Sequence, residues 1–178
     1  MSGKNYLEKV QKEMGLLERI MKYIPGYRGY KERELRRESD RLVRLETANK
    51  LKAAKNILRR KFTNPVEVRK LSNEDASIFE VLLIRLDKVT QRIDKAPAGY
   101  SGVFDAIKVR EDKLDMVIQH DLNLIEKAEF IKKSIENLTK METGKDEWKK
   151  TINEVISKVE ELDELIDQRS EILRGLKD

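Results

Sequence analysis

The chain has 178 residues, of which 40% are charged, and its formal net charge is +5. It contains no cysteine and one histidine, and only 6% of its residues are aromatic. This composition argues against disulfide scaffolds, zinc fingers, thiolate chemistry and membrane spans, and it is typical of proteins built from long helices. We therefore expect one all-α helical domain over residues 1–178, an elongated bundle of about five helices.

The first element is predicted between Tyr6 and Tyr23, where apolar residues recur every three or four positions and predict an amphipathic helix. It ends at the segment 25–30, because proline cannot continue a helix and two glycines favour a turn. A second helix is predicted from about Lys31 to Phe62, a stretch without glycine or proline.

Local signals mark the next boundaries. Asn64 before Pro65 is a favourable cap and first position for a short helical turn. Ser72 and Asp75 have the spacing of a capping box, which predicts the start of a third helix. That helix ends near Pro97 and the glycines that follow it.

A fourth helix is predicted from Val103 to Met141, and Gly144 separates it from the last one. The last segment alternates steps of four and three over four heptads, which is the pattern of a coiled coil. This seam comprises Trp148, Ile152, Val155, Val159, Leu162, Ile166 and Leu173. We expect it to join two copies as a homodimer, because an exposed apolar seam of this length is unfavourable in a monomer.

Two charged residues interrupt the apolar seams, Asp121 in the fourth helix and Arg169 in the last. They could pair with each other or specify register, but exposure of both on one face is the more ordinary interpretation. His120 could act as a general base or a weak metal ligand, with Asp115 and Glu126 near it in the sequence. No second His or Cys supports it, so we expect a surface histidine and no metal.

Charge is distributed unevenly along the chain. Residues 1–70 contain 20 Lys/Arg and 9 Asp/Glu, whereas residues 71–178 contain 18 and 24. The chain thus has a basic half, 1–70, and an acidic, heptad-rich half, 71–178. Such asymmetry favours nucleic acid, an anionic membrane surface or self-association as the partner.

The second predicted helix carries a stripe of cations within an arc of about 100°, at 100° per residue. Its members are Arg33, Arg37, Arg41, Arg44, Lys52, Lys55 and Arg59, and Arg60 and Lys61 extend it to the helix end. A row of this kind could contact the phosphates of structured RNA. The alternative is a solvated face with internal ion pairs to Glu34, Glu38 and Asp40.

Two turns share the pattern Gly-Tyr-x-Gly, at residues 26–29 and 99–102. Tyr27 and Tyr100 could stack on bases, and we group Arg28 with them as an RNA contact. We favour the alternative, in which each tyrosine plugs an end of the bundle.

Three strings carry a resemblance: IPGYRGY at 24–30, LRR at 35–37 and AGYSGVFDAIKV at 98–109. They resemble motifs in a family of uncharacterised helical proteins of bacteria and archaea, over residues 17–125. The resemblance implies an all-helical, non-enzymatic protein. In size and helical character the chain is also similar to archaeal ribosome dimerisation (hibernation) factors, which raises the expectation of a ribosomal partner.

Together these observations predict a non-enzymatic helical homodimer that docks its basic half on structured RNA, with ribosomal RNA or ribosomal proteins as partners. We expect ribosome dimerisation, hibernation or anti-association as its role, a cytoplasmic location, and no cofactor. The alternative is a coiled-coil scaffold or adaptor at an anionic membrane surface or for a protein partner. An enzyme is the third option.

Overall fold

A computed structural model describes residues 14–29, 33–95 and 111–174. These ranges are helical and contain no strand, so the predicted all-α bundle is confirmed. A short helix at 14–21 is followed by α2 (Arg33–Lys61), α3 (Pro65–Val68), α4 (Asn73–Asp94), α5 (Glu111–Leu138) and α6 (Asp146–Arg174). Within the described ranges, no helix combines the length and the apolar character that crossing a bilayer requires.

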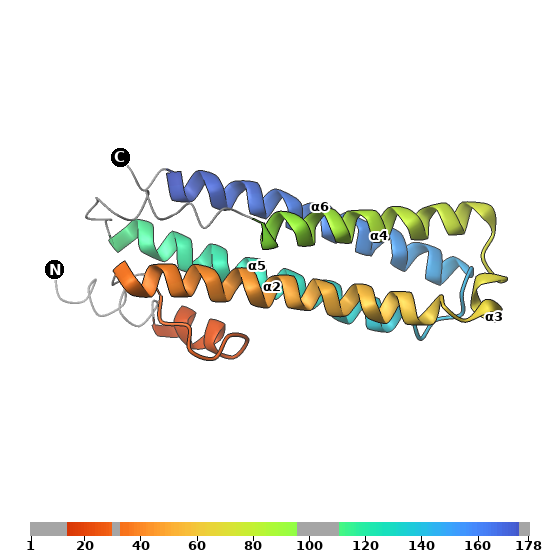
Figure 1. The fold of residues 1–178 in the computed structure, drawn as a ribbon, viewed down its shortest axis with the longest axis horizontal. Coiled ribbons are helices and arrows are strands. Elements are labelled where there is room, and N and C mark those ends of the chain that lie inside the picture. Colours follow the sequence, from red (N-terminus) through yellow and green to blue (C-terminus); the bar gives the residue numbers. More distant parts are fainter. Residues whose placement is uncertain (1–13, 30–32, 96–110, 175–178) are drawn as a thin grey trace.

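The four long helices form two antiparallel hairpins, α2 with α4 and α5 with α6 (Figure 1). The hairpins pack side by side, α2 against α5 and α4 against α6, so that α2 and α6 lie diagonally opposite each other. Both hairpin turns lie at one end of the rod, next to α3 (Figure 1). We call this the α3 end, and the other end the N-terminal end.

The helix boundaries at the α3 end follow from local capping. The Ser72 hydroxyl accepts the Asp75 backbone N–H at 3.1 Å, and the Asp75 carboxylate accepts the Ser72 backbone N–H at 3.2 Å. The predicted capping box is therefore confirmed. The Asn64 carbonyl oxygen likewise accepts the Val66 N–H at 3.0 Å, with Pro65 in the first position of α3.

The two hairpin turns are fastened to each other. Gly144 has a φ of +82°, and a Cβ atom there would lie 2.9 Å from the Lys70 carbonyl oxygen, so a side chain would clash with backbone. The adjacent Thr143 hydroxyl donates to the Glu67 carboxylate at 2.5 Å. The α3 end is thus a closed, defined surface rather than two separate loops.

All four long helices contribute buried apolar residues to a common core. In α6, at most 8% of each of these side chains is exposed: Trp148, Ile152, Val155, Val159, Leu162 and Ile166. Because α6 packs against α4 and α5 of the same chain, this seam is used internally. That corrects the expectation that it joins two copies; the side chain of Leu173 lies outside the described residues.

The N-terminal segment completes the core at its own end of the bundle. Ile20, Ile24 and Tyr27 are buried there. The predicted first helix is described from residue 14 and ends at residue 21, ahead of Pro25. After the turn, the Ser39 hydroxyl of α2 donates to the Gly29 carbonyl at 2.7 Å and holds the segment against the bundle.

Candidate nucleic-acid interface

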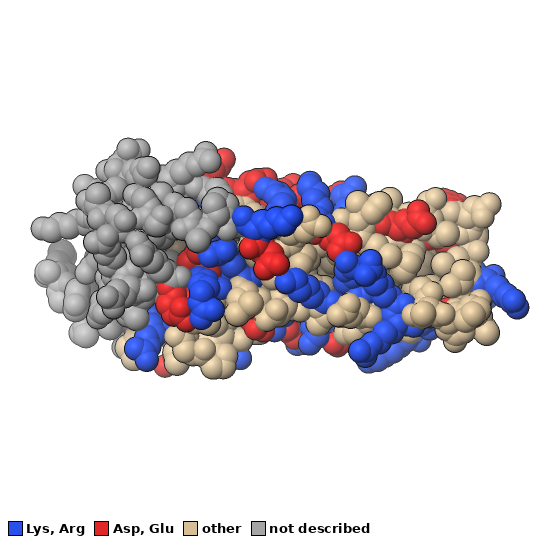
Figure 2. Space-filling view, viewed as in Figure 1, with Lys and Arg blue, Asp and Glu red and all other residues tan. Residues whose placement is uncertain are grey.

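Helix α2 is the basic element of the bundle. It contains 11 Lys/Arg and 4 Asp/Glu, whereas α4, α5 and α6 each contain more acidic than basic residues. Helix α2, which belongs to the predicted basic half, therefore forms one edge of the rod, diagonally opposite acidic α6. In Figure 2, Lys and Arg side chains gather on the α3-end half of α2, whereas both signs are mixed over α4 and α6.

The first residue of the stripe with a described side chain is Arg41, which is accessible. Arg33 and Arg37 belong to α2, but their side chains lie outside the described residues. Arg41 is exposed and forms a bidentate pair with exposed Glu38, with N–O distances of 2.7 and 2.9 Å. Hydrogen bonding within this pair lowers the pKa of Glu38 and raises that of Arg41.

Arg44 turns into the bundle. Its side chain is 15% exposed, and its Nε donates to the buried Asp40 carboxylate at 2.9 Å. The same carboxylate accepts from Arg169 Nη2 at 3.0 Å. Arg44 thus neutralises an interior carboxylate, and we withdraw its assignment as a phosphate contact.

Lys52 and Lys55 are paired with carboxylates of α4. Lys52 Nζ lies 3.0 Å from Asp94 Oδ2, and the two side chains are 47% and 50% exposed. Lys55 pairs with Asp87 and is mostly covered. The alternative interpretation, in which the cations form ion pairs within the chain, is therefore correct for this part of the stripe. The carboxylate partners come from α4, whereas the alternative had placed them on α2.

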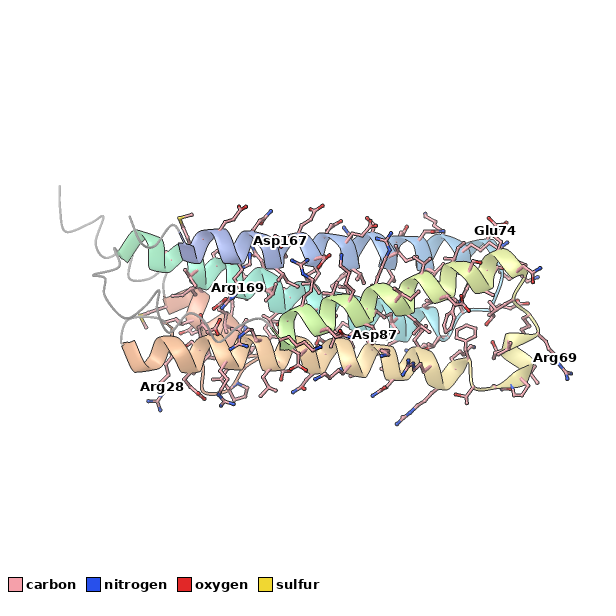
Figure 3. All side chains as sticks on the ribbon, turned by 45° about the horizontal axis from the view of Figure 1, so that its top comes forward. Arg28, Arg69, Glu74, Asp87, Asp167 and Arg169 are labelled. Carbon is pink, nitrogen blue, oxygen red and sulfur yellow. The ribbon has the colours of Figure 1, made fainter. Side chains whose placement is uncertain are left out.

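The α3 end differs from the rest of the stripe. Arg59 and Arg60 are exposed, as is Arg69 just after α3, and none of the three has an ion-pair partner within the described part of the chain. Figure 3 shows Arg69 pointing away from the bundle. Residues 59–70, which we call the basic tip, contain five Lys/Arg and one acidic residue, a net charge of +4.

The acidic residue in the basic tip is Glu67, and it is fully occupied. It accepts hydrogen bonds from Lys70 at 2.7 Å and Thr143 at 2.5 Å, and Lys61 lies 3.2 Å away. These contacts, the one with Lys70 foremost, lower the pKa of Glu67 to about 2. Glu67 therefore pairs with Lys61 and Lys70 and with none of the three arginines.

The tyrosine of the first Gly-Tyr turn is structural. Tyr27 is buried, and its hydroxyl donates to Asp121 Oδ2 at 2.9 Å. It plugs the N-terminal end of the bundle, as we favoured, so we withdraw its assignment as a base-stacking residue. Arg28 is exposed but lies at the opposite end from the basic tip (Figure 3). Tyr100 lies outside the described residues.

A buried ionic cluster lies beneath Tyr27. Arg169 from α6 pairs with Asp121 from α5 and with Asp40 from α2. Asp121 and Arg169 are both buried, which corrects the expectation that they lie exposed and confirms the alternative that they pair. The sequence predicted Asp40 only as a possible ion-pair partner on a solvated face of the second helix.

His120 is buried, with 5% of the residue exposed, and this corrects the expectation of a surface histidine. Burial, reinforced by the nearby Arg169 charge and opposed by the Leu165 backbone, lowers the pKa of His120 to about 4. The ring is therefore neutral at pH 7. Among the residues that the structure describes, no three His, Cys, Asp or Glu side chains group closely enough to hold a metal ion.

A groove of about 580 Å³ runs between α5 and α6 and is lined by Asn123, Glu126, Lys127, Phe130, Lys158, Glu161, Glu164, Leu165 and Gln168. Glu161 in this groove pairs with Lys127 and with Lys158, and these contacts lower its pKa. A general acid at neutral pH needs a raised carboxyl pKa. The geometry of Glu161 is that of a surface ion-pair network.

No protein-family profile, curated protein or solved structure matches the chain. The resemblance carried by the IPGYRGY and AGYSGVFDAIKV strings therefore stays a prediction.

Proposed function

We propose that this protein is a non-enzymatic helical protein that docks on structured RNA through the basic tip, with a ribosomal subunit as the leading partner. The observation that supports the proposal is the set of exposed arginines Arg59, Arg60 and Arg69, which have no carboxylate partner in the described ranges. A phosphate that binds such a cation has no competing carboxylate to displace, so the full charge interaction favours binding.

The residue type and the shape fit this role. A guanidinium group can donate two parallel hydrogen bonds to one phosphate, which makes arginine suited to nucleic-acid backbones. Helix α2 has 29 residues and so spans about 43 Å. The rod presents its basic tip at one end, and such backbone contacts position a protein on RNA without reading its sequence.

Docking in this form uses one copy of the chain, because the α6 seam that suggested a dimer is internal. The acidic α6 edge faces away from α2 and is available to a basic ribosomal protein. A rod bound in this way at the interface side of a subunit would hinder subunit joining, which is the anti-association type of activity.

The test is co-sedimentation of the purified protein with ribosomal subunits at low salt, with and without nuclease treatment. We expect association that nuclease removes. A triple variant, R59Q/R60Q/R69Q, should bind at least about tenfold more weakly. The control, K88Q/K132Q/K133Q, removes three cations from α4 and α5 and should bind like the wild type. Absence of association at low salt, or equal losses in the two variants, would refute the proposal.

A second candidate function, docking on an anionic membrane surface, is favoured by one observation. Val66 and Val68 in the basic tip are 59% and 47% exposed, next to Arg69. Two valines give little apolar area for insertion, so RNA ranks first. Flotation with phosphatidylserine vesicles tests it: V66S/V68S should weaken vesicle binding and leave RNA binding unchanged if the membrane is the target.

A further inference from the structure

We infer that helix α4 limits the RNA-binding surface of α2, because its carboxylates Asp87 and Asp94 occupy the lysines that would extend the basic tip along the rod. The inference rests on the proposed function and specifies which part of the α2 edge meets RNA.

The contacts between α2 and α4 carry this inference. Lys52 and Asp94 approach to 3.0 Å, and Lys55 pairs with Asp87. Figure 3 places Asp87 on α4 at the edge that faces α2. Arg59 lies one helical turn beyond Lys55, and in the described ranges no carboxylate of α4 pairs with it. The part of the stripe whose cations pair with α4 carboxylates therefore ends where the basic tip begins.

Electrostatics explains why these pairs reduce RNA binding even though they are weak. The Lys52–Asp94 pair joins half-exposed groups, whereas the Lys55 and Asp87 side chains are 18% and 39% exposed. Ion pairs at a surface contribute little and are screened by salt, so a phosphate can displace the carboxylate. The displaced carboxylate stays near the lysine because α4 packs against α2, and there it repels the incoming phosphate. Lys52 and Lys55 therefore gain little from RNA, and binding depends on the basic tip.

Neutralising the two carboxylates should lengthen the site. Arg59 lies seven positions after Lys52, which corresponds to about 10 Å along the helix. Two more cations would then face the RNA backbone. Each added phosphate contact increases the slope of log affinity against log salt by somewhat less than one, so the number of recruited lysines can be counted.

The experiment measures dissociation constants for a ribosomal RNA fragment over a series of salt concentrations. The variant D87N/D94N keeps side-chain size while removing two negative charges. We expect binding about tenfold tighter at low salt, with a slope steeper by about 1 to 2. Adding K52Q/K55Q to this variant should abolish the gain.

The matched control is E160Q/D167N. Glu160 and Asp167 of α6 pair with Arg85 and Arg92 of α4 in the same manner, so the control changes net charge equally on another face. Equal gains in the two double variants would show a general charge effect and overturn the inference alone. The inference also fails if the wild type binds and D87N/D94N, folded by circular dichroism, binds no tighter. If none of these proteins binds at low salt, the proposed function itself fails.

Discussion

Replacing Arg169 by methionine tests whether the buried ionic cluster holds the bundle together. The substitution keeps most of the apolar stem but leaves Asp121 and Asp40 without the cation that joins them. Removing one partner of a buried ion pair typically costs 3–5 kcal/mol. Asp121 retains the Tyr27 hydroxyl and Asp40 retains Arg44, so we expect the lower value, about 3 kcal/mol.

The assay is urea unfolding followed by circular dichroism, with thermal unfolding as a second readout. In a chain of this size a loss of 3 kcal/mol corresponds to about 6–12 °C in Tm. The control is Arg85→Met, because Arg85 is partly exposed and pairs with exposed Glu160; it should cost less than about 1 kcal/mol. The double variant R169M/D121N should recover part of the loss. A cost below about 1 kcal/mol for R169M, or no recovery in the double variant, would refute this reasoning.

Three further variants test single features of the fold. His120 has a pKa of about 4 in the folded chain and 6.5 in the unfolded chain. Between these pH values the unfolded state binds more protons than the folded state. The free energy of unfolding therefore falls as the pH is lowered from 6.5 to 4. Denaturation across this range should show a loss of up to about 3 kcal/mol that is absent in His120→Gln. Gly144→Ala should destabilise the fold by more than Gly26→Ala. Both glycines have a positive φ, whose strain alone costs about 1–2 kcal/mol, but only a Cβ atom at Gly144 would contact backbone. Similar losses of stability in the two variants would contradict the clash at Gly144. Tyr27→Phe should cost about 1.5–3 kcal/mol in urea unfolding, since it removes a buried hydrogen bond to a carboxylate; an unchanged midpoint would contradict a stabilising role for this hydrogen bond.

Features set by neighbouring residues could be predicted from the sequence. The caps at Asn64 and Ser72 depend on residues within four positions, and both were predicted correctly. The heptads of α6 also predicted a helix with one apolar face. The prediction that a second copy covers that face was wrong, because heptad spacing is the same in a dimer and in a bundle folded from one chain. The short turn between α5 and α6, which favours antiparallel neighbours, was the available signal.

Features set by distant residues could not be predicted in the same way. The helical projection placed Lys52 and Lys55 correctly on one edge of α2, but Asp87 and Asp94 lie more than 30 positions further along the chain. Which helix lies beside α2 is a tertiary property that no local pattern encodes. The inward turn of Arg44 follows in the same way from buried charges brought together by three helices.

The salt dependence of RNA binding tests the central claim most directly, namely that the exposed arginines of the basic tip carry the interaction. Dissociation constants for a ribosomal RNA fragment would be measured from low to moderate salt for the wild type and for R59Q/R60Q/R69Q. If the three arginines contact phosphates, the slope of log affinity against log salt should become shallower by about 2 to 3 in the variant. A variant with the slope and the affinity of the wild type would contradict the account.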